Sequence, residues 1–226
     1  NEAKYLPNVI TKMKSQTKLP KLWLIIDDNS KDGTDKIIKN IQEEWVIPKS
    51  TKKNAPKSLL NYSKLLYKNT ELLKRIAKKR NISWGALATL DGDSLPEPEY
   101  FSTLLESLDK KQKIGIISGE IIESGNTNSI SHRTDIPWGA AMVYRRECLD
   151  DIGGISPTPS HNSVEITIAQ SKGWITTSND SVKFEHLRPM GTNNGGYKGH
   201  SEMGRAAHWL GIPLSFALLK SMKLMF

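Results

Sequence analysis

Short apolar runs alternate with amphipathic segments along most of this 226-residue chain. Apolar runs that stop at turn residues predict strands over residues 21–28, 85–90, 114–122, 138–144 and 181–185. Apolar residues at helical spacing predict helices over residues 3–16, 37–41, 59–80, 100–108 and 145–152, and another between residues 160 and 173. Residues 46–58 contain two prolines and are expected to form a polar loop. This alternation favours a single α/β domain, and no linker or internal repeat divides the chain.

Two acidic pairs come at the ends of predicted strands. Asp27 and Asp28 end the first strand, and Asp91 and Asp93 follow the second. Because open α/β sheets bind ligands at the carboxyl ends of their strands, both pairs are expected on one ligand-binding edge. Such carboxylates suit a divalent cation beside phosphates. The alternative is that they are only turn and helix-cap residues.

The composition excludes several classes of protein. A single cysteine, Cys148, rules out a disulfide framework and a thiolate metal site, and it favours a reducing compartment such as the cytoplasm. The net charge is +8, with much of the excess in residues 49–80. A run of this kind is most often a solvated helical face, although it also suits anionic lipid or a phosphorylated substrate. No nucleic-acid partner is expected, because the sequence holds no RNA-binding signature, helix-turn-helix pattern or zinc finger.

The C-terminal segment is strongly apolar, and no signal peptide is recognisable. A proline and two lysines interrupt residues 209–226, which favours an amphipathic helix over a membrane span. We therefore divide the chain into a main domain, residues 1–200, and a C-terminal extension, residues 201–226. The extension either packs on the domain or lies on the cytoplasmic face of a membrane.

Four segments resemble, in their order and spacing, those of the family 2 glycosyltransferases with the GT-A fold. They are Asn1-Glu2, the nucleotide-binding type of segment over residues 25–34, the Asp-x-Asp segment over residues 91–93, and the acceptor-side segment that begins at Trp138-Gly139 and continues to Gly153-Gly154. The resemblance implies a single Rossmann-like domain with a mostly parallel central sheet flanked by helices. Family members place a buried strand before the Asn-Glu pair, and that strand is missing from the numbered chain.

The resemblance also implies a reaction, in which a hexosyltransferase moves a sugar from a nucleotide-diphosphate donor, with a UDP-sugar favoured. The transfer would be metal-dependent and inverting. Asp93 is implied to contact Mn²⁺ or Mg²⁺, Asp91 to reach the metal or the ribose, and His186 to complete the metal or diphosphate site. For the nucleotide base, Asp28 is the implied acceptor of a hydrogen bond, with Asp27 and Ser30 in the same segment.

Three further residues lie on the implied diphosphate and acceptor side. Arg188 would neutralise phosphate oxygens, and Trp138, next to Gly139, would either stack on a sugar face or fill the core. The acceptor is a lipid-linked molecule, a glycan or a protein. The basic surface and the apolar C-terminus favour a lipid-linked or membrane-proximal one.

The catalytic base is where the chain departs from the resemblance. An inverting transfer needs a group that takes the proton of the acceptor hydroxyl. The family usually provides an aspartate eleven residues before the glycine of a Gly-Trp pair, and in this chain Asn162 occupies that position before Gly173. Glu165 shares a helical face with Asn162 and is the favoured substitute. His161 is the second candidate, because histidine titrates near neutrality.

Two other functions are consistent with parts of the sequence. A haloacid dehalogenase-like phosphatase also places an Asp-x-Asp loop after a strand, but usually near the N-terminus, and no late metal-binding motif of that family is recognisable. A non-catalytic protein that binds nucleotide sugars is the stronger alternative, because an asparagine stands where a base is expected.

Overall fold

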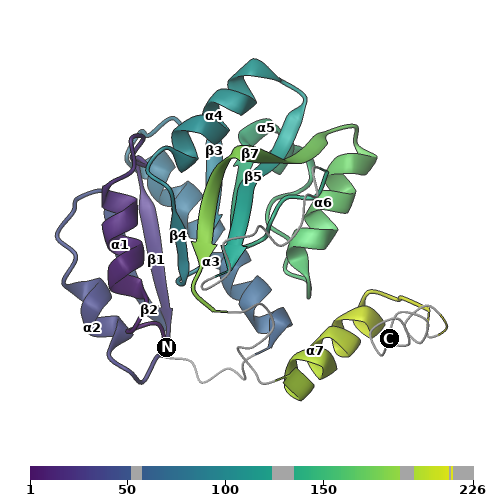
Figure 1. The fold of residues 1–226 in the computed structure, drawn as a ribbon, viewed down its shortest axis with the longest axis horizontal. Helices are drawn as coiled ribbons and strands as arrows, with labels where there is room; N and C mark the ends of the chain where they lie inside the picture. The colour runs from purple at the N-terminus through teal and green to yellow at the C-terminus, as the bar shows by residue number, and fades with distance from the viewer. Residues whose placement is uncertain (52–57, 124–134, 189–195, 214, 216–226) are drawn as a thin grey trace.

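The computed structural model describes residues 1–51, 58–123, 135–188, 196–213 and 215 (Figure 1). Strands and helices alternate in the order α1 (Leu6–Lys14), β1 (Trp23–Asp28), α2 (Thr34–Lys39), β2 (Val46–Thr51), α3 (Leu59–Lys79), β3 (Ala86–Leu90), β4 (Ser94–Pro96), α4 (Tyr100–Lys110), β5 (Ile114–Glu123), β6 (Ala141–Arg145), α5 (Arg146–Asp151), α6 (His161–Ser171), β7 (Ile175–His186) and α7 (Gly196–Trp209). The expected α/β class is confirmed.

The described strands form two sheets. β1 and β2 pair in parallel, and a five-stranded sheet has the order β3-β6-β5-β7-β4. Within the larger sheet only β5 and β7 run parallel, whereas the β3–β6, β5–β6 and β4–β7 pairs are antiparallel. The expectation of a mostly parallel sheet is therefore wrong for the larger sheet. The apolar pattern could not set strand direction, because parallel and antiparallel strands alternate their side chains in the same way.

Several element boundaries differ from the prediction. Residues 46–51 form β2 instead of the start of a polar loop. β6 begins at Ala141, after the predicted start at 138, and β7 begins at Ile175, well before the predicted start at 181. The expected domain boundary at residue 200 falls within α7, while most of the apolar segment 209–226 lies outside the described residues.

Each face of the larger sheet is covered by helices. Along β6, Ala141 and Val143 belong to the core that α1 and α4 cover, while Met142 and Tyr144 belong to the core that α5 and α6 cover. This separation follows from the alternation of side chains along a strand. α2 packs on β1 and β2 through Ile38 and completes the first core.

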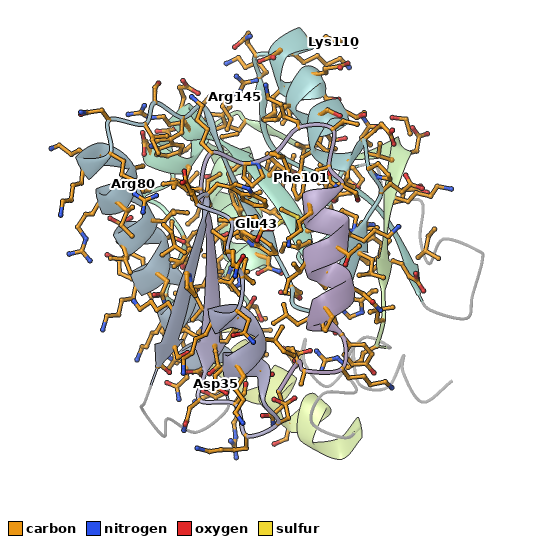
Figure 2. All side chains as sticks on the ribbon, turned by 90° about the vertical axis from the view of Figure 1, so that its left-hand side faces the viewer. Asp35, Glu43, Arg80, Phe101, Lys110 and Arg145 are labelled. Atoms are coloured by element: carbon orange, nitrogen blue, oxygen red, sulfur yellow. The ribbon has the colours of Figure 1, made fainter. Side chains whose placement is uncertain are left out.

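Two buried polar side chains connect the layers. The Tyr100 hydroxyl donates to the carbonyl of Ala141 at 2.6 Å and accepts from the Gly119 amide at 2.8 Å, so it joins α4 to β5 and β6. The Arg145 guanidinium, which is buried, donates to the carbonyls of Ile114 and Leu108 at the far end of β6. Figure 2 shows Arg145 among other side chains below the end of α4, where Lys110 points outward.

Replacing Tyr100 with phenylalanine tests the first of these connections. The change leaves one carbonyl and one amide buried without a partner, which is expected to cost about 1–3 kcal/mol of unfolding free energy. Urea denaturation followed by circular dichroism measures the loss. Tyr67→Phe, at an exposed tyrosine of α3, is the control, and equal effects of the two changes would contradict the assignment.

Candidate active site

The turn after β3 brings two carboxylates to the end of β7. The Asp91 amide donates to the carbonyl of Ala140 and so extends the β3–β6 pairing, and the Ser94 amide closes the turn on the carbonyl of Asp91 at 3.1 Å. β4 then pairs with β7 so that Ser94 faces His186. In addition, the Leu187 amide donates to the Asp93 carbonyl at 2.9 Å. The backbone alone therefore fixes Asp91, Asp93 and His186 around one point.

These three side chains can hold a metal ion. Each offers one ligand atom, and these atoms all lie within 4.8 Å of one another. Asp93 and His186 are buried, and Asp91 is partly buried. The Nδ1 atom of His186 contacts the carbonyl of Arg188, which can only accept, so Nδ1 carries the proton. The Nε2 atom, which lies 3.5 Å from Asp93 Oδ1, then offers its lone pair to a cation. Two carboxylates and an imidazole suit Mn²⁺ or Mg²⁺.

Arg188 connects the cluster of Asp91, Asp93 and His186, here called the metal-type cluster, to the start of the chain. Its Nε donates to Asp93 Oδ2 at 2.6 Å, and its Nη2 contacts both carboxylate oxygens of Glu2 at 2.8 and 2.9 Å. The guanidinium also lies 5.4 Å from the centre of the Tyr5 ring. Glu2 packs against Gly92, where a Cβ would approach the Glu2 Cγ to 3.1 Å. The short Asp-Gly-Asp turn thus fits closely against Glu2.

The environment of Asp91 disfavours its charged form. Burial, followed by the charge of Asp93, raises the pKa of Asp91 from 3.8 to about 6, although the hydrogen bond from Tyr62 and, less strongly, His186 and His161 oppose the shift. The Tyr62 hydroxyl of α3 donates to Asp91 Oδ1 at 3.0 Å. The charge of Asp91 in turn raises the pKa of Tyr62 well above its usual value, which keeps this hydroxyl protonated.

The nucleotide-type segment, residues 25–34, is held in shape by hydrogen bonds of its polar side chains. Asp27 is buried and accepts from the Ser30 amide at 3.2 Å, while the exposed Asp28 accepts from the Thr51 hydroxyl of β2 at 2.6 Å. Asp32 accepts from Thr34 and from the Ala3 amide. The hydrogen bond from the Thr34 side chain is the largest cause that lowers the pKa of Asp32 to about 2. Asp27 and Asp32 therefore shape the loop, and Asp28 is the carboxylate at its surface.

The N-terminal dipeptide is attached to the same loop. The Glu2 amide donates to Thr34 Oγ1 at 2.8 Å, and Asn1 Oδ1 accepts from the Lys31 amide at 2.8 Å. Because the Glu2 side chain contacts Arg188, Glu2 connects the nucleotide-type loop with the metal-type cluster.

Trp138 and Gly139, expected on the acceptor side, contact β5 and α6. The Trp138 amide donates to Ser118 Oγ at 2.8 Å, and its ring packs partly against the core, with a buried indole N–H that has no partner among the described residues. Asn162 lies directly over Gly139, where a Cβ would meet the Asn162 amide nitrogen at 1.7 Å. Only glycine fits this position without displacing Asn162.

Glu165, the favoured base, is one of the most deeply buried side chains, with 1% of its surface exposed. It accepts hydrogen bonds from Tyr144, the Ser156 amide and His161. Glu165 is therefore a core side chain and not a surface glutamate. His161 is also buried, and its ring lies 5.8 Å from that of Tyr62.

Comparisons with known proteins agree with this architecture. The model of the family described as Glycosyl transferase family 2 matches residues 1–61. A sequence search of curated proteins found no match to the chain. Among solved structures, a mannosyltransferase from Pyrobaculum calidifontis in complex with GDP-Man and Mn²⁺ superposes with a TM-score of 0.55 over 84% of this chain, at 15% identity.

Two further structures superpose at a similar level. TarS from S. aureus has a TM-score of 0.59 over 83% of this chain, and GalNAc-T7 with UDP, GalNAc and Mn²⁺ has a TM-score of 0.56 over 80%, each at 12% identity. The chain has the GT-A glycosyltransferase fold. The expected GT-A fold is confirmed apart from the direction of the strands in the larger sheet, and the resemblance to family 2 is confirmed over residues 1–61. The chain spans 56%, 35% and 40% of the lengths of the mannosyltransferase, TarS and GalNAc-T7.

Three residues of this GT-A site were not anticipated from the sequence. Glu2 was noted only as part of a motif, Tyr62 was not considered on its predicted helix, and Tyr144 was assigned only to a strand. Their contacts with Arg188, Asp91 and Glu165 join segments that are distant in the sequence. No pattern in the sequence marks such contacts, because they depend on how the helices and strands pack.

The raised pKa of Asp91 predicts a pH-dependent effect of Asp91→Asn. The folded chain holds this proton more tightly than the unfolded chain, so ionised Asp91 destabilises the fold fully above about pH 6, and the effect disappears below pH 3.8. Asp91→Asn keeps the acceptor for Tyr62 and removes the charge. We expect it to raise the melting temperature of the metal-free chain by several degrees at pH 8, with a much smaller rise near pH 4.

Thermal unfolding of both proteins at the two pH values measures this difference. Asp109→Asn, at an exposed position near the end of α4, is the control. A rise of equal size at both pH values would contradict the electrostatic explanation.

Proposed function

We propose that this chain is a metal-dependent, inverting glycosyltransferase that uses a nucleotide-diphosphate sugar. The observation that carries the proposal is the convergence of Asp91, Asp93 and His186 at one edge of the sheet, next to Arg188. A divalent cation bound there would stabilise, as a Lewis acid, the charge that develops on the diphosphate leaving group. The family model that matches residues 1–61 and the GT-A fold support the same reaction class.

The other site residues are proposed to hold the donor. Asp28 is exposed beside the loop and is suited to accept a hydrogen bond from the base. Arg188, which already pairs with two carboxylates, would exchange part of these contacts for phosphate oxygens. We favour a UDP-sugar. The mannosyltransferase was solved with GDP-Man and GalNAc-T7 with UDP, so a direct comparison of donors decides the base.

The runner-up is a protein that binds a nucleotide sugar without transferring it. This alternative rests on Asn162, which has an amide where an aspartate is expected. The phosphatase alternative is weaker, because the Asp-x-Asp turn lies within a GT-A fold. Nucleotide release from a donor sugar separates the enzyme from the binding protein.

Donor binding tests the proposed metal site. Ligands that bind the folded chain raise its melting temperature, so UDP-, GDP- and dTDP-sugars with and without Mn²⁺ are compared first, by thermal shift. We then expect Asp93→Ala to weaken Mn²⁺-dependent binding of the best donor by about 10–100-fold or more. Loss of a group that only supports a metal ligand already lowers metal affinity by about that factor, and Asp93 is proposed to contact the metal itself. Calorimetry measures the affinity.

Two variants make this experiment specific. Asp109→Ala, at an exposed and distant position, is expected to leave donor affinity unchanged. Asp28→Ala is expected to weaken nucleotide binding with or without Mn²⁺, because its role does not pass through the metal. Unchanged UDP–Mn²⁺ affinity in Asp93→Ala would refute the metal assignment, and an Asp28→Ala effect that vanishes without metal would refute the contact with the base.

We also propose a peripheral contact with an anionic membrane at the cytoplasmic face. No described helix is long and apolar enough to cross a bilayer. At the end of α7, however, Trp209, Leu210 and Ile212 are 53%, 37% and 37% exposed. Exposed apolar side chains on a basic protein suit an interfacial position, and a lipid-linked acceptor would be presented there.

Vesicle binding tests this contact. The wild-type chain is expected to sediment with phosphatidylserine-containing liposomes, and the double variant Trp209→Ser/Leu210→Ser is expected to lose most of this binding. Leu19→Ser, which removes an equally exposed leucine between α1 and β1, is the control. Equal sedimentation of the three proteins would exclude a role for the end of α7.

A further inference from the structure

Both oxygens of the Glu165 carboxylate accept hydrogen bonds. Its Oε2 accepts from the Tyr144 hydroxyl at 2.6 Å, and its Oε1 accepts from the Ser156 amide at 2.6 Å and from His161 Nδ1 at 3.2 Å. With 1% of its surface exposed, it lies in the core between β6 and α6. A carboxylate held in this way orients its donors, and it is poorly placed to take a proton from a substrate.

The contact with Glu165 determines the state of the His161 ring. A carboxylate accepts, so the Nδ1 atom of neutral His161 carries the proton and the lone pair lies on Nε2. Among the described residues, Nε2 has no hydrogen-bond partner. Ser160, directly before His161, has a left-handed backbone with φ of 55°, a strained conformation for a residue other than glycine. The turn into α6 therefore holds His161 in a specific orientation.

Tyr62 links His161 to the metal-type cluster. Its ring is 5.8 Å from the ring of Tyr62, at an interplanar angle of 41°, and the Tyr62 hydroxyl contacts Asp91. Asn162, the next residue, lies on Gly139 of the expected acceptor-side segment. His161 is thus placed between the side that would hold the donor phosphates and the side that would hold the acceptor.

We propose that His161 Nε2 takes the proton of the acceptor hydroxyl, and that Glu165 is the residue that positions His161. The inference rests on the proposed glycosyltransferase function and assigns its missing base. Asn162 cannot serve, because an amide does not accept a proton near neutral pH. Glu165 also offsets the positive charge that His161 acquires, as a buried carboxylate does for a catalytic histidine elsewhere.

The proton and electron balance of the step is simple. The acceptor O–H bond breaks and its proton moves to His161 Nε2, while the acceptor oxygen forms a bond to the anomeric carbon of the sugar. The bond between that carbon and the diphosphate oxygen breaks, and its electron pair stays on the diphosphate. Water in place of the acceptor follows the same course and gives the free sugar.

The first experiment measures nucleotide release from the donor that gives the largest thermal shift, with Mn²⁺ and with water as the acceptor. His161→Ala is expected to lower kcat by about 10²–10⁴-fold, the usual contribution of general base catalysis, with an unchanged affinity for the donor. Added imidazole is expected to restore part of the turnover. His208→Ala, at an exposed histidine of α7, is the control and is expected to keep full activity.

The second measurement does not require activity or a stable variant. Nitrogen-15 NMR of the wild-type imidazoles is expected to show neutral His161 with a protonated Nδ1 and a bare Nε2. Glu165→Gln, if folded, is expected to shift His161 toward the other tautomer and to lower kcat without changing the donor affinity. A purely structural role of Glu165 would change the melting temperature and leave the tautomer unaltered.

The outcomes separate the inference from the proposed function. Nucleotide release that persists unchanged in His161→Ala, or an Nε2-protonated His161 in the wild-type protein, would overturn the inference alone. Wild-type protein that binds the donor and never releases nucleotide would overturn the proposed function, and the proton acceptor with it. A kcat loss with imidazole rescue and the Nδ1-protonated tautomer would support both.

Discussion

The site depends on one ion-pair chain, in which Arg188 joins Glu2 to Asp93. The carboxylates of Glu2, Asp91 and Asp93 lie close together in a partly buried region. Their mutual repulsion and desolvation destabilise the fold unless a cation balances their charge. Arg188 supplies that charge from just beyond the end of β7. Because the Glu2 amide also contacts Thr34, the same chain connects the nucleotide-type loop, the Asp-Gly-Asp turn and the last strand. A guanidinium suits this role, since its planar donors can contact two carboxylates at once.

Most elements could be predicted because their burial leaves a periodic pattern. The long helix α3 was predicted almost to its ends, and β1 and β3 were recognised from apolar runs. β2 was missed because it is an edge strand with a single fully buried side chain and a proline, which an edge tolerates. The first half of β7 is polar and partly exposed as well, so only its buried Val182 and Phe184 marked a strand. The direction of the strands was not predictable from periodicity, because antiparallel and parallel strands share the same alternation.

The candidate site could be predicted as far as strand ends could be located. Asp91, Asp93 and His186 each follow or end a strand, and the topology brings them together. The roles of Glu165 and His161 could not be separated in the same way. Spacing places Glu165 on the face of Asn162, yet its carboxylate is held by donors from Tyr144 and Ser156, which lie on other segments. The sequence therefore did not predict contacts between side chains from different helices and strands, because the residues involved are far apart in the chain.

Tyr62 contacts both the metal-type cluster and His161. Its hydroxyl contacts Asp91, its ring faces His161, and both contacts come from the first turn of the basic helix α3. A shift of this turn would disturb the two contacts together. A metal ion bound at Asp91 and the orientation of the His161 imidazole would therefore influence each other through Tyr62, and by the same free energy. Under the proposed function, this one aromatic residue of α3 would make the orientation of the proposed base depend on donor binding.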